Sequence, residues 1–181
     1  GYELYVELKD TKKIYELITN KGKDFNLSNC GMHAMDIMRM ESGFLHWGHD
    51  ISPVENQYQA GLSFTISHKK DVDFIGRKAL EKIKKEKLKS RFTMFILKDS
   101  KPGIPLLLHD EPIYLEDKII GRTTSGNYSF NYNKNLSFGY ISSNLSNEEL
   151  QNKKLFIEVE KQKYAVNILL KPLKDSKFKV I

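Results

Sequence analysis

The chain has a single cysteine, Cys30, which excludes an internal disulfide framework and a cysteine-rich zinc site. No apolar run approaches the roughly 18 residues that a membrane-spanning helix requires, so the sequence argues against a membrane protein. Disorder over the whole length is excluded too, because 40% of the 181 residues are hydrophobic and 11% are aromatic. We therefore expect a globular protein of a reducing compartment: the cytoplasm, or the mitochondrial matrix in a eukaryote.

Charge of one sign is only slightly in excess, at a formal net +6. The one dense basic cluster lies in residues 82–91, where apolar residues recur at helical spacing. This pattern is typical of the solvated face of a helix. A nucleic-acid groove would interleave aromatic residues with the basic ones, and this segment has none, so we expect no nucleic-acid partner. A diffuse positive field would favour a polyanionic small molecule.

The first half of the chain mixes helix and strand patterns. Alternating apolar residues predict half-buried strands over residues 2–8 and 61–67. Helical spacing predicts helices over residues 11–22, from Asn29 to Gly43, and over residues 76–89. The chain opens inside the first of these strands and without Met, which indicates a fragment of a longer protein.

The second half is dominated by short strands separated by turn residues. Their close, even spacing predicts a small closed or nearly closed barrel. The composition changes near Ser90, which we take as a domain boundary. The expected strands are residues 91–97, 112–116, 118–124, 127–130, 136–141, 154–160 and 163–170.

The run from Gly121 to Gly126 superficially resembles a phosphate-binding loop. It lacks the Gly-Lys-Ser/Thr ending that engages phosphate and Mg²⁺, and it precedes a strand where a phosphate loop would precede a helix. We interpret it as a turn between barrel strands from which Arg122 projects.

Two histidines, His46 and His49, stand three residues apart beside Asp50. A zinc site needs three or four converging ligands, and no recognised ligand motif is present. We therefore predict ordinary surface or hydrogen-bonded histidines and no metal site. No residue is marked as a catalytic nucleophile, Cys30 included.

Glu3 has two interpretations. The alternation places it on the strand face opposite Tyr2 and Leu4, and most glutamates are simply exposed to solvent. Alternatively, a carboxylate flanked by aromatic surface can accept paired N–H donors from a heterocycle, such as the amidine-like edge of a pterin.

Several stretches stand in the right order and at plausible spacing and together resemble one family. They are residues 1–6, 34–41, 47–50, 60–62, 73–80 and 121–126. By these stretches the chain is similar to the C-terminal part of the dimethylglycine and sarcosine dehydrogenases, which is itself similar to the aminomethyltransferase T-protein of the glycine cleavage system. The resemblance covers essentially the whole chain.

The resemblance implies an α+β fold class: a partial T-protein-like folate-binding α+β domain over residues 1–90, followed by a small antiparallel β-barrel over residues 91–181. It also implies tetrahydrofolate as cofactor and partner, with FAD in a missing N-terminal flavin domain. By motif, Glu3 corresponds to the family's pterin-contacting glutamate. Arg39 corresponds to the arginine of a family helix, with either a structural ion pair or a folate contact as its role. Arg122 is the third candidate cofactor-binding residue.

The function implied is the capture of a one-carbon unit as 5,10-methylenetetrahydrofolate, after the flavin domain has oxidised an N-methyl amine to an iminium. We expect the fragment alone to be inactive, because chemistry at carbon needs the flavin. Two alternatives stay open: an aminomethyltransferase of the glycine cleavage system, and a non-enzymatic folate-binding module.

Overall fold

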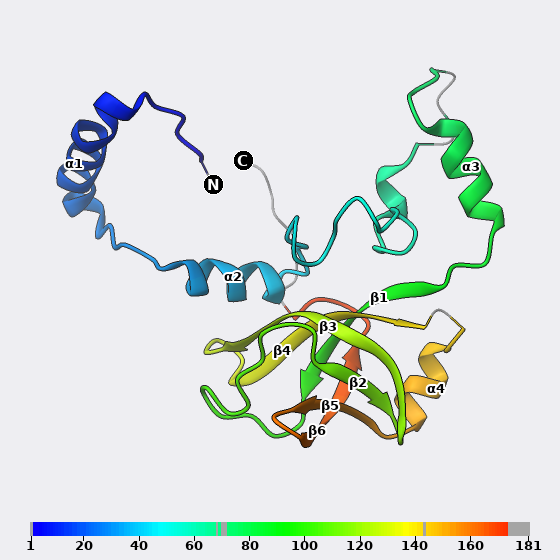
Figure 1. Cartoon of the computed structure of the whole chain (residues 1–181). Helices are drawn as coiled ribbons and strands as arrows, with labels where there is room; N and C mark the ends of the chain where they lie inside the picture. Colours follow the sequence, from blue (N-terminus) through cyan, green and yellow to red (C-terminus); the bar gives the residue numbers. More distant parts are fainter. Residues whose placement is uncertain (1, 68, 70–71, 143, 174–181) are drawn as a thin grey trace. The chain divides into compact units, whose positions relative to one another are not determined.

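The computed structural model describes residues 2–67, 69, 72–142 and 144–173 (Figure 1). They fall into two compact units, one up to Met32 and the other from His33 onwards. Each unit is described by itself below.

The first unit is built around helix α1 (Thr11–Gly22), flanked by the 3-10 helices η1 (Leu8–Asp10) and η2 (Lys23–Phe25). The helix predicted over residues 11–22 is therefore confirmed, although none of its residues is buried. The strand predicted over residues 2–8 is wrong. Apolar alternation forms a strand only where a second strand supplies hydrogen-bond partners, and residues 2–7 are instead irregular and exposed.

Helix α2 (Met32–Glu41) ends before Gly43, as the sequence predicts. Helix α3 (Arg77–Lys85) is shorter than the predicted range of 76–89, because the backbone is already extended at Glu86. The strand predicted over residues 61–67 is wrong: the 3-10 helix η3 (Ser63–Thr65) stands there. Its hydrogen bonds are local, since the Thr65 hydroxyl donates to the Leu62 carbonyl at 2.7 Å.

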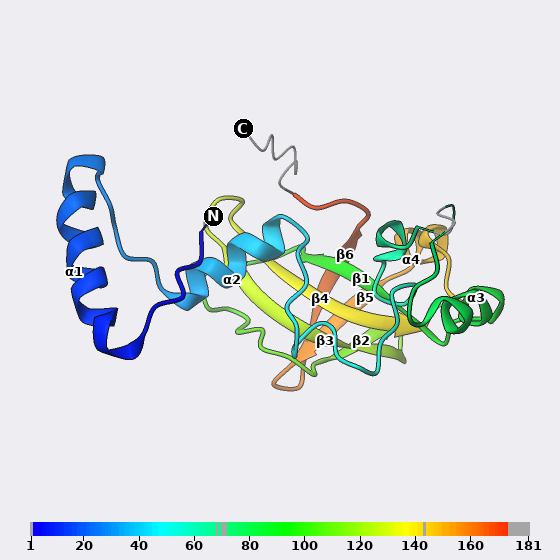
Figure 2. The same cartoon turned by 90° about the horizontal axis from the view of Figure 1, so that it is seen from above.

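Six antiparallel strands form a closed barrel in the order β1-β4-β3-β2-β5-β6, and β6 pairs back to β1. Both views show α2 along the side of the barrel that β3 and β4 form (Figures 1 and 2). The predicted α+β architecture with a C-terminal barrel is confirmed. The strands are β1 (Ser90–Leu97), β2 (Pro112–Leu115), β3 (Lys118–Ser129), β4 (Lys134–Ser142), β5 (Leu155–Val159) and β6 (Gln162–Leu169).

Alternation along β1 explains how the barrel is filled and covered. Phe95 and Leu97 point inward and are buried in the barrel interior, with side chains from the other strands. Phe92 and Met94 point outward and pack beside a second cluster, in which residues of α2 contact β4. This second cluster fixes α2 on the barrel surface; its buried members are Ile37, Met40, Leu136 and Phe138.

The run from Gly121 to Gly126 lies inside the long strand β3, so the predicted turn is wrong, as is the division into strands 118–124 and 127–130. The glycines serve close packing. A Cβ at Gly121 would collide with the Tyr140 carbonyl, and one at Gly126 would collide with Leu107. A register shift between Thr123 and Ser125 locally bends the strand.

Helix α4 (Asn147–Asn152) was not predicted. Its signal was present in the sequence as a capping box: Ser146 accepts from the Glu149 amide, and Glu149 accepts from the Ser146 amide. In the described part of the chain, no helix is long and apolar enough to cross a membrane.

Candidate functional site

A buried ion pair joins α2 to the loop that precedes η3. The Arg39 guanidinium bonds to the Asp50 carboxylate, whose side chain is fully buried. Arg39 also donates from Nε to Asp36 at 2.9 Å and from Nη2 to the Ser125 hydroxyl at 2.8 Å. Its charge lies 5.4 Å from the centre of the Phe138 ring. Arg39 is thus bound on several sides by the protein itself.

Asp50 collects donors from two directions. It accepts from the backbone amide of His46 at 2.9 Å and from the Ser125 hydroxyl at 2.8 Å. The Thr124 hydroxyl donates at 2.5 Å to Oδ1, the same oxygen that Ser125 contacts. These hydrogen bonds are charge-assisted, and together they stabilise a carboxylate whose burial would otherwise cost much free energy. The network holds the 46–50 loop against β3.

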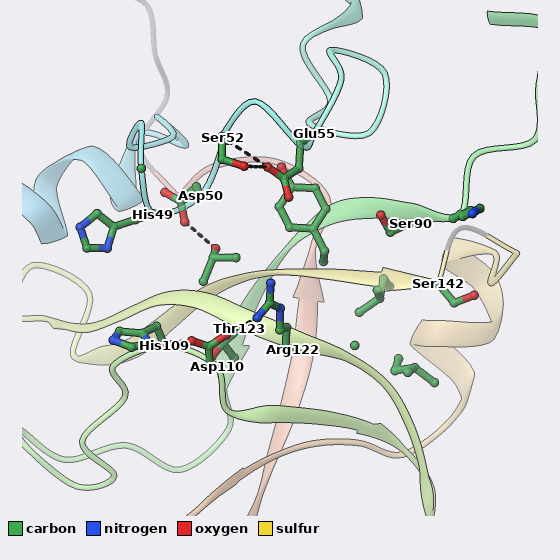
Figure 3. Close-up of a pocket in the computed structure, with 17 residues that line it drawn as sticks. His49, Asp50, Ser52, Glu55, Ser90, His109, Asp110, Arg122, Thr123 and Ser142 are labelled. Carbon is green, nitrogen blue, oxygen red and sulfur yellow. Dashed lines mark hydrogen bonds and ion pairs between the residues drawn. The ribbon is translucent and has the colours of Figure 1, made fainter. Parts of the chain in front are cut away.

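A groove of about 720 Å³ opens beside this network, on the outer surface of the barrel (Figure 3). Most of its lining residues are polar, and they come from the 48–55 loop, the start of β1, the 109–110 loop, β3 and β4. The lining residues are Gly48, His49, Asp50, Ser52, Glu55, Lys89, Ser90, His109, Asp110, Ile120, Gly121, Arg122, Thr123, Thr124, Tyr140, Ile141 and Ser142.

Arg122 reaches this groove from β3 and is largely exposed. Its Nη1 donates to Asp110 at 2.7 Å, and the second oxygen of Asp110 lies 2.9 Å from Nδ1 of His109. The hydrogen bond with His109, helped by the positive charge of Arg122, holds the pKa of Asp110 below its ordinary value against the opposing effect of burial. Asp110 therefore stays ionised and anchors one edge of the Arg122 guanidinium.

Tyr140 carries a buried hydroxyl with no hydrogen-bond partner among the described residues. Burial raises the pKa of this phenol, and the negative charges of Glu55 and Asp50 raise it further. Glu55 itself accepts from the amide and the hydroxyl of Ser52, at 2.9 and 2.6 Å, through Oε2 alone. The upper wall of the groove thus contains one carboxylate oxygen, Oε1 of Glu55, that accepts no hydrogen bond from the described part of the chain.

The sequence-predicted candidates lie in different places. Arg122 lines the groove, and Arg39 lies behind it, bound to the lining residue Asp50. Of the two roles expected for Arg39, the ion pair is present; a folate contact stays a prediction. Glu3 belongs to the first unit, where it is exposed and accepts from the Tyr5 hydroxyl at 2.7 Å. That hydrogen bond raises the pKa of Tyr5.

Sequence reasoning missed Asp50, Asp110 and Tyr140. Asp50 was noted beside two histidines, as part of a metal question, and within the stretch 47–50; its position 11 residues after Arg39 was the available sign of an ion pair. Those histidines, His46 and His49, stack with ring centres 4.6 Å apart. Among the described residues, no three His, Cys, Asp or Glu side chains are grouped so as to hold a metal ion.

Comparison with known protein families divides the chain into two matched segments. Residues 1–70 match the family described as the GCVT N-terminal domain. Residues 91–175 match the one described as the glycine cleavage T-protein C-terminal barrel domain. The second match corresponds to the barrel that the structure contains.

Individual relatives agree with these matches. Mitochondrial dimethylglycine dehydrogenase of Rattus norvegicus is 34% identical over 175 residues, which are 96% of this chain and 20% of that protein. An aminomethyltransferase of Symbiobacterium thermophilum is 33% identical over 78% of this chain and 36% of its own length. The chain therefore spans about a fifth and about a third of these relatives.

The fold has a close counterpart in a crystal structure of the glycine cleavage system aminomethyltransferase T from Bartonella henselae. The TM-score is 0.75 at 21% identity, over 90% of this chain and 44% of that one. With both domain matches, the barrel and these relatives in hand, the chain belongs to the glycine cleavage T-protein family, as the C-terminal T-protein-like region that dimethylglycine and sarcosine dehydrogenases share with aminomethyltransferases.

Proposed function

We propose that this chain is the C-terminal tetrahydrofolate-binding region of a flavin-dependent N-methylglycine dehydrogenase acting on dimethylglycine or sarcosine. The observation that carries the proposal is the extent of the resemblance: similarity to dimethylglycine dehydrogenase runs through 96% of the chain, against 78% for the aminomethyltransferase. In this role the chain helps convert the one-carbon unit into 5,10-methylenetetrahydrofolate. FAD is assigned to a flavin domain outside these residues, and that domain is the proposed partner.

The chemistry of the side chains fits a folate. Exposed carboxylates such as Glu3 can accept two N–H donors from the amidine edge of a pterin. In the second unit, the groove offers the Arg122 guanidinium, a group that can donate to carboxylates. When bound, tetrahydrofolate supplies the nitrogen atoms that accept the one-carbon unit. The chain's own residues bind and orient it, and we assign none of them a catalytic role.

The test is an assay of the intact protein that carries this chain. We expect oxidation of dimethylglycine or sarcosine coupled to formation of 5,10-methylenetetrahydrofolate, and no such turnover by residues 1–181 alone. Tetrahydrofolate should bind the intact protein, and Glu3→Gln should weaken that binding about tenfold, the effect of losing one charge-assisted contact. Enzyme-like turnover by the 181 residues alone would contradict the proposal.

An aminomethyltransferase of the glycine cleavage system is the second candidate, favoured by the relative from Symbiobacterium. It predicts activity with glycine and a lipoyl carrier protein and none with N-methylated amines. A third candidate, a non-enzymatic folate-binding module, predicts folate binding with neither activity. The single, exposed cysteine fits our further proposal of a reducing compartment, either cytoplasm or mitochondrial matrix.

A further inference from the structure

Helix α3 and the residues just after it carry an excess of positive charge (Figure 1). Both glutamates of residues 77–87 are paired within this segment: Glu81 accepts from Arg77 at 3.2 Å, and Glu86 lies 4.0 Å from Lys82. Four further lysines are exposed, and no carboxylate in the described part of the chain pairs with them. They are Lys78, Lys84, Lys85 and Lys87.

The lysines and the apolar residues of α3 lie on opposite faces of the helix. With about 3.6 residues per turn, Lys78, Lys82 and Lys85 fall on one face. Leu80 and Ile83 fall on the other. The three lysines are exposed, whereas Leu80 and Ile83 are half-buried. The apolar face is therefore turned toward the second unit, and the row of lysines is turned to solvent.

A turn with exposed aliphatic side chains precedes the helix. Val72 and Ile75 are 74% and 104% exposed. Arg77 holds this turn against α3, because its Nη1 donates to the Val72 carbonyl at 3.3 Å and its amide donates to the Phe74 carbonyl at 3.2 Å. Single exposed apolar residues are ordinary on a protein surface. Here two of them are fixed at the end of a row of lysines.

This combination distinguishes between the negatively charged partners that lysines attract. A single-stranded nucleic acid would require aromatic residues among the lysines for base stacking, and residues 77–87 have none. The centre of a protein–protein interface is depleted in lysine. An anionic membrane suits both features, because lysines attract its headgroups while aliphatic side chains enter its interfacial region.

We propose that this surface docks the protein peripherally on an anionic lipid membrane. The docking surface consists of Lys78, Lys82, Lys84, Lys85 and Lys87, which contact the headgroups, and of Val72 and Ile75, which insert between them. The contact involves no crossing of the bilayer. It does not depend on the proposed function, because neither folate nor turnover takes part in it.

The experiment measures sedimentation of the intact protein with lipid vesicles. Vesicles of phosphatidylcholine and phosphatidylserine should bind the protein, less tightly as salt is raised, and vesicles of phosphatidylcholine alone should not. A triple variant, Lys78→Gln with Lys82→Gln and Lys85→Gln, should bind roughly 100-fold more weakly, since each lysine contributes about fivefold. Ile75→Ser should weaken binding about tenfold and leave its salt dependence unchanged.

The matched control removes three exposed lysines at the far end of strand β1, so that the change in net charge is the same. It is Lys98→Gln with Lys101→Gln and Lys161→Gln: Lys98 and Lys101 follow the end of β1, and Lys161 precedes the antiparallel partner strand β6. This variant should bind the mixed vesicles within about twofold of the parent. Thermal unfolding of every variant should match that of the parent, because only exposed side chains are exchanged.

Three results would overturn the proposal. The first is an intact protein that does not bind the anionic vesicles. The second is an equal loss of binding in the two triple variants, which would show attraction by net charge without a defined surface. The third is an Ile75→Ser protein that binds as the parent does, which would leave a purely electrostatic surface suited to an acidic protein or a nucleic acid.

Discussion

Arg39 and Asp50 form an ion pair in which the aspartate side chain is wholly buried and the arginine side chain nearly so, at 14% exposed. The pair links α2, the 46–50 loop and, through Ser125, strand β3. One charged contact thus holds together two segments that are close in sequence and a strand whose Ser125 lies 75 residues after Asp50. Loss of this ion pair should therefore destabilise all three segments.

Removing one of the two charges of this ion pair should strongly destabilise the fold. Arg39→Gln leaves the Asp50 carboxylate buried without its cationic partner, which costs about 3–5 kcal/mol of unfolding free energy. Asp50→Asn should cost less, because Arg39 keeps its ion pair with Asp36. Urea denaturation followed by tyrosine fluorescence measures the change. Lys82→Gln, at an exposed pair with Glu86, is the control and should cost less than about 1 kcal/mol. Equal effects at the two sites would show that the buried pair is not a structural anchor.

Glycines of β3 should not tolerate a methyl group. Gly121→Ala and Gly126→Ala drive a Cβ into the neighbouring backbone or side chain, and each should destabilise the barrel by about 1–3 kcal/mol or more. Gly31→Ala places its Cβ in open space and should change stability by less than about 0.5 kcal/mol. Thermal unfolding monitored by circular dichroism distinguishes the three variants. A Gly121→Ala protein as stable as the parent would refute the close-packing explanation.

Removing the Tyr140 hydroxyl should stabilise the folded protein. The group is buried and finds no partner in the described residues, so Tyr140→Phe should raise the unfolding free energy by about 0.5–2 kcal/mol. The raised pKa of Tyr140 means that the folded state keeps this proton after the unfolded state has lost it. Its contribution to stability is thus complete below about pH 10 and declines as pH rises further. The Tyr140→Phe protein should lack this loss of stability at high pH. If its unfolding free energy fell between pH 10 and 11 as much as that of the parent protein, the assignment of the loss to Tyr140 would be wrong.

Asp110 should titrate below the ordinary range. Because its folded pKa is lowered, its stabilising effect is present above about pH 4 and disappears as pH falls through the folded value. His109→Gln should raise this pKa more than Arg122→Gln does, since the hydrogen bond from His109 is the larger cause. Carbon-detected NMR of the Asp110 carboxyl reports both changes. If Arg122→Gln raised the pKa more than His109→Gln did, then Arg122 and not His109 would be the main cause of the lowered pKa of Asp110.

Much of the barrel was predictable from the sequence, because its strands are short runs rich in apolar residues; in β1 the side chains alternate between half-buried and buried from Phe92 to Leu97. Prediction failed where local pattern and long-range packing disagree. Residues 2–8 alternate but meet no strand within their unit, and residues 121–126 combine turn-like composition with a position inside β3. The boundary placed between residues 90 and 91 stays a prediction, although β1 begins at Ser90.

The candidate site was only partly predictable for the same reason. Arg122 was expected to project from its segment, and it does line the groove. The donors to Asp50 from Thr124 and Ser125 are 74 and 75 positions away in sequence. No local pattern connects residues so distant, and only the register shift in β3 places both hydroxyls at one carboxylate.

Closure of the barrel has a consequence for biosynthesis. Among the barrel strands β1 is made first, but it finds one of its two neighbours only in β6, the last of these six strands to be synthesised. Until then the nascent sheet has two open edges, at β1 and β5, whose unpaired amides and carbonyls can recruit strands of other molecules. Ribosomal stalling or premature termination just before residue 162 should therefore yield aggregates.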